Sequence, residues 1–258
     1  MSLLSVSGLT KHFGGVVANR DVGFDVRPGE LVGVIGPNGA GKSTLFDLVT
    51  GVLRPDAGDV RLDGRSILGF RPDEIACLGV ARTFQKLRPF PEMTVAENVM
   101  IGAFQKTADV AAARDAAMRA LEAVGLADRA DAHARALSTG QRKRLELARA
   151  LATEPRLLLL DEVTGGVDQA TVPALVRLVR DLHARGLALV VIEHNMRVIM
   201  EISERIVALQ LGEVIAHGTP AEIMRDRRVI DAYLGEAWSR APEAGHPRSE
   251  PGSRPPLE

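Results

Sequence analysis

The sequence can be interpreted from one segment, Leu31-Val-Gly-Val-Ile35-Gly36-Pro-Asn-Gly-Ala-Gly41-Lys42-Ser43. This segment contains the pattern G-x-x-x-x-G-K-[ST]. An apolar run precedes the pattern, and a helical pattern over 42–50 follows it. A strand, a glycine-rich turn and a helix N-terminus in this order are typical of a phosphate-binding loop. Backbone N–H groups would surround the anion, Lys42 would add a full positive charge, and the Ser43 hydroxyl could bind Mg²⁺. The alternative is a glycine-rich turn that only caps a helix.

Two more apolar runs, Leu157–Leu160 and Leu187–Ile192, are separated by a helical pattern over 172–185. Uninterrupted apolar strands that alternate with helices indicate a parallel sheet buried on both faces. The sequence therefore predicts an α/β core.

Polar residues follow both of these runs. Asp161 and Glu162 come after the first, and Glu193 and His194 come after the second. Ligands of open α/β sheets bind beyond the carboxyl ends of the strands, so Lys42, Asp161, Glu162 and His194 are expected to converge on one crevice. Asp161 suits Mg²⁺, Glu162 suits a general base, and His194 would face the phosphate. Without the phosphate loop, the acidic pair and the histidine could simply cap helices.

The remaining chain divides into an N-terminal part, an insertion and a tail. Leu4–Val6 and Val22–Val26 are predicted to be hairpin strands. Residues 86–152 are predicted to form an alanine-rich helical insertion, with capping-box helix starts at Thr94–Glu97 and Ser138–Gln141. The folded domain is expected to span residues 1–235, because the proline-rich segment 236–258 can bury too little apolar surface and should be disordered.

The segment Leu137-Ser138-Thr139-Gly140-Gln141 opens a helix within that insertion. Ser138 and Gln141 have the spacing of a capping box, and the same helix N-terminus could bind an anion. One chain cannot easily use this site and the Lys42 loop on one nucleotide. The following Arg142-Lys143-Arg144 is interpreted as a solvated helix face.

Two further candidates are less specific. Gln85 ends the predicted strand 80–85, and its amide oxygen could sense a water molecule or coordinate Mg²⁺. Phe13 could stack on an adenine, although an ordinary core position is equally consistent with its surroundings.

Composition excludes several classes of protein. The net charge of -1 and the aromatic fraction of 3% do not fit a basic nucleic-acid binder that stacks on bases. The longest apolar runs are far shorter than the roughly 20 residues of a membrane-spanning helix. The single cysteine and an N-terminus without signal-peptide features lead us to expect a cytoplasmic protein.

The order of these motifs resembles that of the ATP-binding subunit of ABC transporters over about residues 3–235. It most resembles the larger of the two ATPase subunits in branched-chain (hydrophobic) amino acid importers. The segments that carry this narrower resemblance are Leu9–Gly15, Ala81–Gln85, Phe90–Asn98, Ile192–Met196, Ala216–Pro220 and Ala232–Gly235. The family implies an α/β fold with a P-loop NTPase (RecA-like) parallel-sheet core, an N-terminal antiparallel β subdomain and an α-helical insertion.

The resemblance also implies a role for each candidate residue, with ATP and Mg²⁺ as cofactors. Catalysis would involve Glu162, His194, Gln85 and Lys42, and the metal would bind Ser43, Gln85 and Asp161. The nucleotide would contact Phe13, Gly36, Pro37, Asn38, Gly39, Ala40, Gly41, Lys42, Ser43 and Thr44 of one subunit, and Ser138, Thr139, Gly140 and Gln141 of the other. Asp168 would communicate across the dimer.

The partners implied are a second ABC ATPase subunit bound head to tail, membrane permease subunits contacted near Leu87–Val99, and indirectly a periplasmic or extracellular substrate-binding protein. Such a subunit lies peripherally on the cytoplasmic face of the inner membrane, and no nucleic acid is expected.

Two residues depart from the common family pattern: Thr139 stands where many relatives have glycine, and Val163 where proline usually follows the glutamate. Val163 leaves open a module that binds ATP without hydrolysing it. The same motifs would also suit an ATPase for lipopolysaccharide extraction or for urea or amide uptake, and a soluble ABC ATPase without a transport role.

Overall fold

The computed structural model describes residues 2–84 and 89–238. Its central element is a six-stranded sheet in the order β10-β9-β3-β8-β7-β6. The strands are β3 (Leu31–Ile35), β6 (Val80–Arg82), β7 (Leu157–Asp161), β8 (Ala188–Ile192), β9 (Arg205–Gln210) and β10 (Glu213–Gly218). Pairing is parallel from β6 to β9, and β10 runs antiparallel to β9. The predicted parallel core is confirmed.

Strand β3 has buried side chains on both faces of this sheet. Val32 and Val34 belong to one hydrophobic cluster, and Leu31 and Ile35 belong to another. Successive side chains of a strand point to opposite faces, so an uninterrupted apolar run is needed when both faces are covered.

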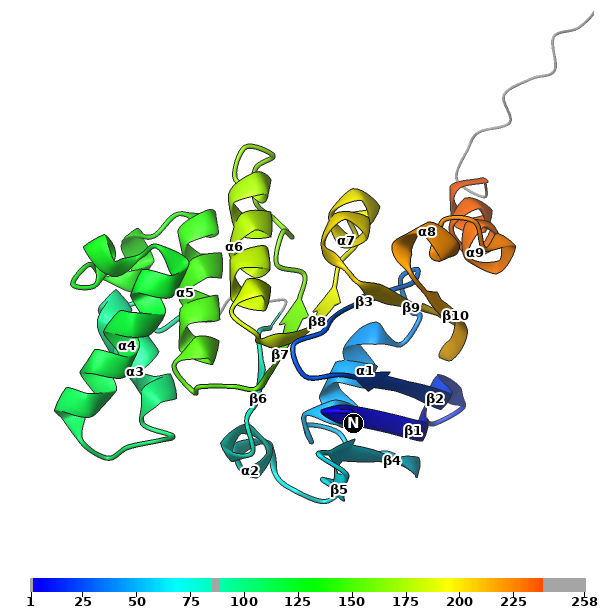
Figure 1. Ribbon diagram of the computed structural model, residues 1–258, viewed down its shortest axis with the longest axis horizontal. Coiled ribbons are helices and arrows are strands. Elements are labelled where there is room, and N and C mark those ends of the chain that lie inside the picture. Colours follow the sequence, from blue (N-terminus) through cyan, green and yellow to red (C-terminus); the bar gives the residue numbers. More distant parts are fainter. Residues whose placement is uncertain (1, 85–88, 239–258) are drawn as a thin grey trace, which may run out of the picture.

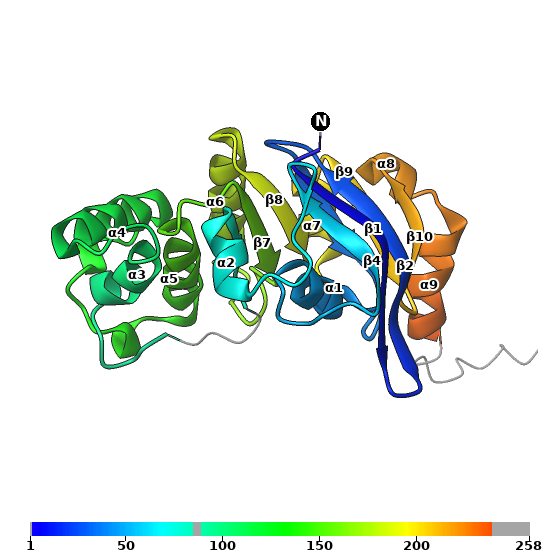
Figure 2. The same ribbon diagram turned by 90° about the horizontal axis from the view of Figure 1, so that it is seen from below.

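A second sheet has four strands in the order β2-β1-β4-β5. They are β1 (Leu4–Phe13), β2 (Val16–Val26), β4 (Ala57–Leu62) and β5 (Arg65–Ser66). β1 and β2 pair antiparallel, which confirms the N-terminal hairpin, although both strands are longer than predicted. Helix α1 (Lys42–Val49) packs between the two sheets, where Phe46 shares a cluster with Val32 and Val60 (Figure 2).

The insertion forms a helical lobe at one side of the six-stranded sheet (Figure 1). It follows α2 (Pro72–Cys77) and contains α3 (Val95–Ala103), α4 (Val110–Val124), the short 3₁₀ turns η1 (Ala127–Arg129) and η2 (Ala134–Ala136), and α5 (Thr139–Leu151). Both predicted capping boxes are present, with Thr94 starting α3 and Ser138 starting α5. Hydrogen bonds from these side chains satisfy N–H groups that a helix start would leave unpaired.

The remaining helices are α6 (Val172–Ala184), α7 (Met196–Ile202), α8 (Pro220–Ile223) and α9 (Arg227–Trp238). Leu175 of α6 and Ile199 of α7 share a cluster with Leu31 and Ile35, so these helices cover the sheet face opposite α1. α9 continues past the predicted domain end at Gly235. Across the part of the chain that the structure describes, every helix is too short or too polar to cross a bilayer.

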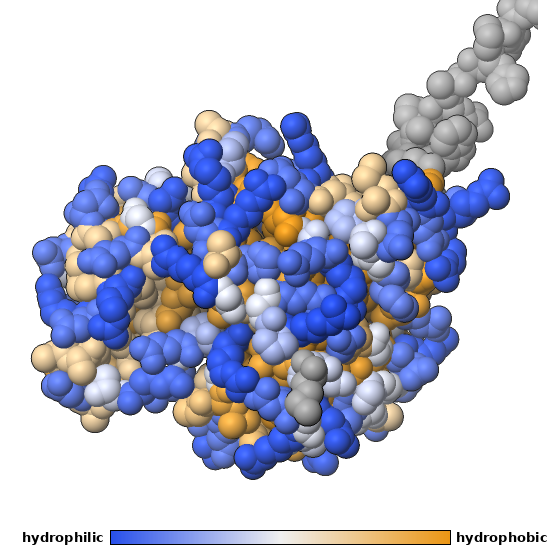
Figure 3. All heavy atoms as spheres, in the orientation of Figure 1, coloured by the Kyte–Doolittle hydropathy of each residue, from blue (hydrophilic) through white to orange (hydrophobic). Residues whose placement is uncertain are grey.

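Polar and charged side chains cover most of the face seen in Figure 3, and apolar side chains gather in the recess between the helical lobe and the core.

Candidate functional site

The loop between β3 and α1 takes a shape that two of its glycines make possible. Gly36 has φ +152°, and a Cβ there would lie 2.2 Å from the Leu209 carbonyl oxygen. Gly41 has φ +96°, and its Cβ would lie 2.2 Å from the Ala18 oxygen. These conformations and contacts require glycine, which lets the loop turn tightly into α1.

Lys42 begins α1 and is buried, with 6% of its surface exposed. Its Nζ donates to the carbonyl oxygens of Gly36 at 2.6 Å and Pro37 at 2.9 Å. The ammonium therefore lies inside the curve of the loop. Gly41 caps α1 without a side-chain hydrogen bond, so the first N–H groups of the helix are not capped by a side chain. A cation beside a helix N-terminus favours an anion such as phosphate.

Glu162 and His194 form a close pair at the carboxyl ends of β7 and β8. His194 Nε2 lies 2.8 Å from Glu162 Oε1. The backbone of Glu162 has φ +54°, and its N–H donates to the Ile192 carbonyl at 2.9 Å. The parallel sheet thus brings together two side chains that are distant in sequence, and the carboxylate has the chemistry of a general base.

Glu193, which precedes His194, joins the two loops that carry this pair. It is buried and accepts hydrogen bonds from the backbone N–H of Thr164 at 2.7 Å and from the Thr164 hydroxyl at 3.0 Å. Burial raises the pKa of the Glu193 carboxyl above its ordinary value. No role was predicted for Glu193 from the sequence, although its place after an apolar strand was a usable signal.

Asp161 is buried beside Arg82, whose Nη2 donates to Asp161 Oδ2 at 3.1 Å. Arg82 also forms an ion pair with Asp47 of α1, which makes it a second site residue that was not predicted from the sequence. Burial raises the pKa of the Asp161 carboxyl. Asp161 Oδ1 is buried without a hydrogen-bond partner among the described residues, which fits a ligand for a hard cation.

A pocket of about 280 Å³ brings together most of the predicted phosphate loop and the Glu162–His194 pair. The predicted site residues that line it are Asn38, Gly39, Ala40, Gly41, Lys42, Ser43, Thr44, Glu162 and His194. The predicted crevice is present for Lys42, Glu162 and His194, but Asp161 does not line it and is hydrogen-bonded to Arg82 instead. Gly36 and Pro37 do not line the pocket, but their carbonyl oxygens accept hydrogen bonds from Lys42.

Among the other predicted site residues that the structure describes, Phe13, residues 138–141 and Asp168 do not line this pocket. Phe13 is 47% exposed near the end of β1, with Lys11 Nζ 5.8 Å from its ring centre. The segment 138–141 forms the N-terminus of α5 in the helical lobe, where the Gln141 N–H donates to Ser138 Oγ at 3.3 Å. Asp168 is exposed, and hydrogen bonds from Thr171 lower the pKa of its carboxyl. Gln85 lies outside the described residues.

The interpretation of Arg142-Lys143-Arg144 as a solvated helix face is wrong. Lys143 is only 5% exposed, and its Nζ donates to the Glu162 carbonyl oxygen at 2.7 Å. Arg142 and Arg144 donate to the carbonyl groups of Arg135 and Val124. A charged run looks the same in sequence whether its helix faces solvent or another element, and long aliphatic stems allow such residues to be buried.

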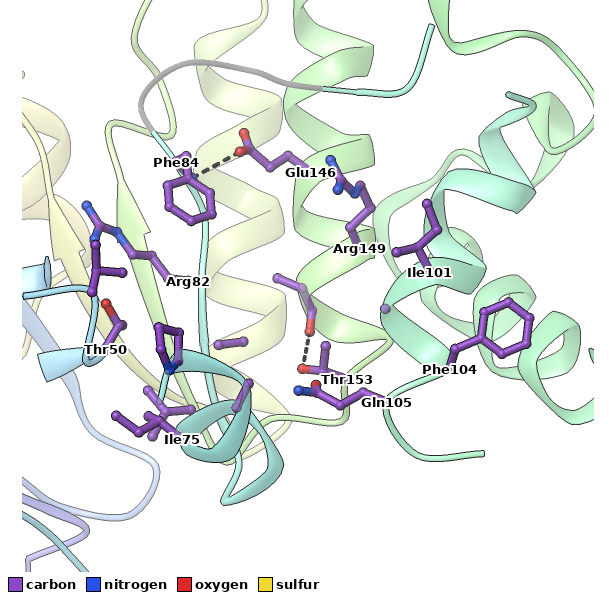
Figure 4. Close-up of a pocket in the computed structure, with 17 residues that line it drawn as sticks. Thr50, Ile75, Arg82, Phe84, Ile101, Phe104, Gln105, Glu146, Arg149 and Thr153 are labelled. Carbon is purple, nitrogen blue, oxygen red and sulfur yellow. Dashed lines mark hydrogen bonds between the residues drawn. The ribbon is translucent and has the colours of Figure 1, made fainter. Parts of the chain in front are cut away.

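A second hollow, of about 580 Å³, lies between the core and the helical lobe. Phe84 and Arg82 lie on one side, Ile101 of α3 and the following Phe104 lie on the other, and Glu146 and Arg149 of α5 lie between them (Figure 4). The Phe84 N–H donates to Glu146 Oε1 at 3.0 Å. We call this hollow, as lined by these six residues, the inter-lobe groove.

Two family models match the chain. A model described as ABC transporter matches residues 19–165, more than half of the chain. A model described as branched-chain amino acid ATP-binding cassette transporter matches residues 213–238.

Characterised relatives match over almost their full lengths. The high-affinity branched-chain amino acid transport ATP-binding protein BraF of Pseudomonas aeruginosa is 41% identical, over 91% of this chain and 98% of BraF. The lipopolysaccharide export system ATP-binding protein LptB of Haemophilus influenzae is 36% identical, over 92% of this chain and 99% of LptB.

Solved structures share the fold. The ADP conformation of MJ1267, an ATP-binding cassette of an ABC transporter, has a TM-score of 0.83 at 31% identity, over 91% of this chain and 99% of that one. The dimeric MJ0796 cassette in a post-hydrolysis state, bound to ADP and Pi, has a TM-score of 0.75 at 28% identity, over 84% and 98% of the two chains.

Proposed function

This chain belongs to the ABC transporter family, and we propose that it is the ATP-binding and ATP-hydrolysing subunit that drives import of branched-chain or other hydrophobic amino acids. The observation that carries the ATPase assignment is the pocket that joins the phosphate loop around Lys42 to the Glu162–His194 pair.

In this proposal, the loop N–H groups, the N-terminus of α1 and Lys42 bind the β- and γ-phosphates. Glu162 accepts a proton from a water molecule as the water oxygen attacks the γ-phosphorus, and the bond to the bridging oxygen breaks to leave ADP and phosphate. His194, 2.8 Å from the carboxylate, orients Glu162 and contacts the γ-phosphate.

Asp161, Ser43 and Gln85 would hold Mg²⁺. Asp161 Oδ1 supports this, because a buried carboxylate oxygen with no hydrogen-bond donor among the described residues suits a hard cation. When bound, Mg²⁺ would neutralise charge on the β- and γ-phosphates.

The proposed active form is a head-to-tail dimer. Residues 138–141 of one subunit cover the nucleotide that is bound at Lys42 of the other subunit. Phe13 stacks on the adenine, and Asp168 lies near the dimer interface. Residues 138–141 at the N-terminus of α5 do not line the Lys42 pocket of their own chain, which supports a contribution from a second subunit. The dimeric MJ0796 structure gives further support.

Glu162→Gln tests both the base and the dimer. We expect this variant to lose turnover and to elute as a nucleotide-bound dimer in ATP and Mg²⁺, because the amide cannot accept the proton. Glu122→Gln, an exposed change on α4, is the matched control. Wild-type turnover by Glu162→Gln would refute the base assignment.

The inter-lobe groove is the proposed docking site for a membrane permease. Phe84 and Phe104 are 53% and 44% exposed in it, and a partner that buried them would remove apolar surface from water. Phe104→Glu should weaken co-purification with the permease and leave ATP binding intact. The control is Val110→Glu, which changes an exposed apolar residue outside the groove. Equal co-purification of the two variants would contradict this site.

The transported class rests on the C-terminal family match and on the relative BraF, because the solute does not touch this subunit. Co-purification from native membranes, with identification of the permease and its binding protein, tests it. Recovery of a lipopolysaccharide-export permease or of another unrelated permease would overturn the amino acid assignment. As a transporter subunit, the protein would lie peripherally on the cytoplasmic face of the inner membrane.

A further inference from the structure

Glu162 has a backbone conformation that L-residues with a side chain rarely adopt. Its φ of +54° lies in the left-handed region. The other described non-glycine residues with positive φ, which are Asp21, Asp63, Glu154 and Leu211, do not line the phosphate pocket. A strained residue persists only where neighbouring groups hold it.

The carbonyl group of this same residue is held by Lys143. Lys143 Nζ donates to Glu162 O at 2.7 Å, and the Gly165 N–H donates to the same oxygen at 3.2 Å. A hydrogen bond from an ammonium is stronger than one from a neutral donor. The Glu162 N–H donates to the Ile192 carbonyl oxygen of β8. Hydrogen bonds to the sheet and from Lys143 of α5 therefore both hold the Glu162 backbone in place.

Lys143 is buried, and a buried positive charge is stable only when nearby negative charges or hydrogen bonds compensate it. Two carboxylates supply this compensation: the charge of Lys143 counteracts the effect of burial on the pKa of both Glu193 and Glu146. The ammonium is thus part of a buried polar network rather than a surface charge.

The direction of the Glu162 side chain depends on this backbone conformation. The carboxylate meets His194 on one side, and a Cβ on Gly165 would lie only 3.1 Å from Glu162 Oε2 on the other. The loop after β7 therefore folds closely around the carboxylate. A rotation of the Glu162 peptide would move the carboxylate away from the pocket.

We propose that Lys143 is a positioning residue for the reaction: its ammonium holds Glu162 in the left-handed conformation that directs the carboxylate at the attacking water. This inference rests on the proposed function, in which Glu162 is the base.

Lys143→Met tests it, because methionine has a similar length and no donor. We expect kcat to fall at least tenfold with the KM for ATP little changed, and the melting temperature to fall as well, because the buried carboxylates Glu193 and Glu146 lose a compensating charge. Lys143→Arg keeps a charged donor and should recover part of the lost rate. In a Glu162→Gln background, Lys143→Met should change the residual rate less than twofold, because a residue that acts through the carboxylate has nothing left to position.

If the methionine variant does not fold, Lys143→Gln is the alternative variant. Its shorter side chain does not reach the Glu162 carbonyl in the same way, so it should also lower kcat with ATP binding intact. Wild-type kcat in a folded Met or Gln variant, alongside an inactive Glu162→Gln, would overturn the role of Lys143 alone. Wild-type turnover by Glu162→Gln would instead refute the assignment of Glu162 as the base in the proposed function. A further loss of tenfold or more in the double variant would show that Lys143 does not act through Glu162.

Discussion

Arg82, which lines the inter-lobe groove, forms a buried ion pair with Asp161 at the end of β7, with Arg82 Nη2 3.1 Å from Asp161 Oδ2. The guanidinium also lies near the rings of Phe46 and Phe84, at 5.5 and 5.2 Å from their centres. One side chain thus connects the proposed metal ligand, helix α1 and a residue of the groove.

Arg82→Lys should weaken Mg²⁺ binding severalfold with little effect on ATP binding. Lysine keeps the charge but lacks the planar fork that contacts Asp161 and Asp47 together, so the Asp161 carboxylate loses its orientation. The measurement is the Mg²⁺ concentration that gives half of the ATP-dependent rise in melting temperature. Arg114→Lys alters an exposed pair with Asp131 and is the control. Identical Mg²⁺ dependence in both variants would contradict this role.

Gly41→Ala should disrupt the phosphate loop more than Gly39→Ala does. Both glycines have positive φ, so each alanine costs about 1–2 kcal/mol of stability. At Gly41 the new Cβ would also meet Ala18 O at 2.2 Å, whereas at Gly39 no atom of the described residues beyond its two chain neighbours lies within 4 Å. Overpacking adds about 1–3 kcal/mol. Denaturant unfolding and ATP-induced stabilisation measure the two effects, and equal losses at both positions would contradict the steric argument.

Tyr233→Phe should weaken the attachment of α9 to the phosphate loop. The Gly36 N–H donates to the Tyr233 hydroxyl at 2.7 Å, and loss of one hydrogen bond costs about 0.5–1.5 kcal/mol. We expect a lower free energy of unfolding and a modest rise in the KM for ATP. Ile230→Val on the same helix is the control. A variant with wild-type stability and KM would show that this contact is dispensable.

The Glu30–Arg205 ion pair should stabilise the protein in a pH-dependent manner. Burial raises the pKa of the Glu30 carboxyl, but hydrogen bonds from Arg205 and from the Arg27 backbone outweigh this and hold it below its usual 4.5. Because the pKa is lower in the folded state, the stabilisation is present above pH 4.5 and is lost as the pH falls through the folded-state pKa.

Glu30→Gln should therefore lower the free energy of unfolding by about 1.5–3 kcal/mol at neutral pH. The difference from wild type should narrow at acid pH, which unfolding curves at about pH 7 and pH 3 would measure. Glu213→Gln, which removes an exposed pair with Arg20, should cost less than about 1 kcal/mol at either pH. A Glu30→Gln deficit that is independent of pH would contradict the ion-pair explanation.

Local patterns predicted much of the fold. The runs 31–35, 157–160 and 187–192 agree with β3, β7 and β8 to within a residue at each end. The capping residues Thr94 and Ser138 also begin their helices as predicted. Such features depend on hydrophobic periodicity and on hydrogen bonds between residues three positions apart, which short segments contain.

Contacts between distant segments could not be predicted in this way. Asp161 was predicted to be a metal ligand, but its partner Arg82 is 79 positions away in sequence and was not predicted. The burial of Lys143 depends on how α5 packs against the loop after β7.

The sequence alone therefore determined the candidate site residues and the strands that position them, because apolar periodicity and the glycine-rich loop are local. Only the tertiary structure decided that Arg82 orients Asp161 and that Lys143 supports Glu162. A long cationic side chain has similar sequence neighbours whether it meets water or a buried oxygen atom, and the packing of separate elements determines which of the two it contacts.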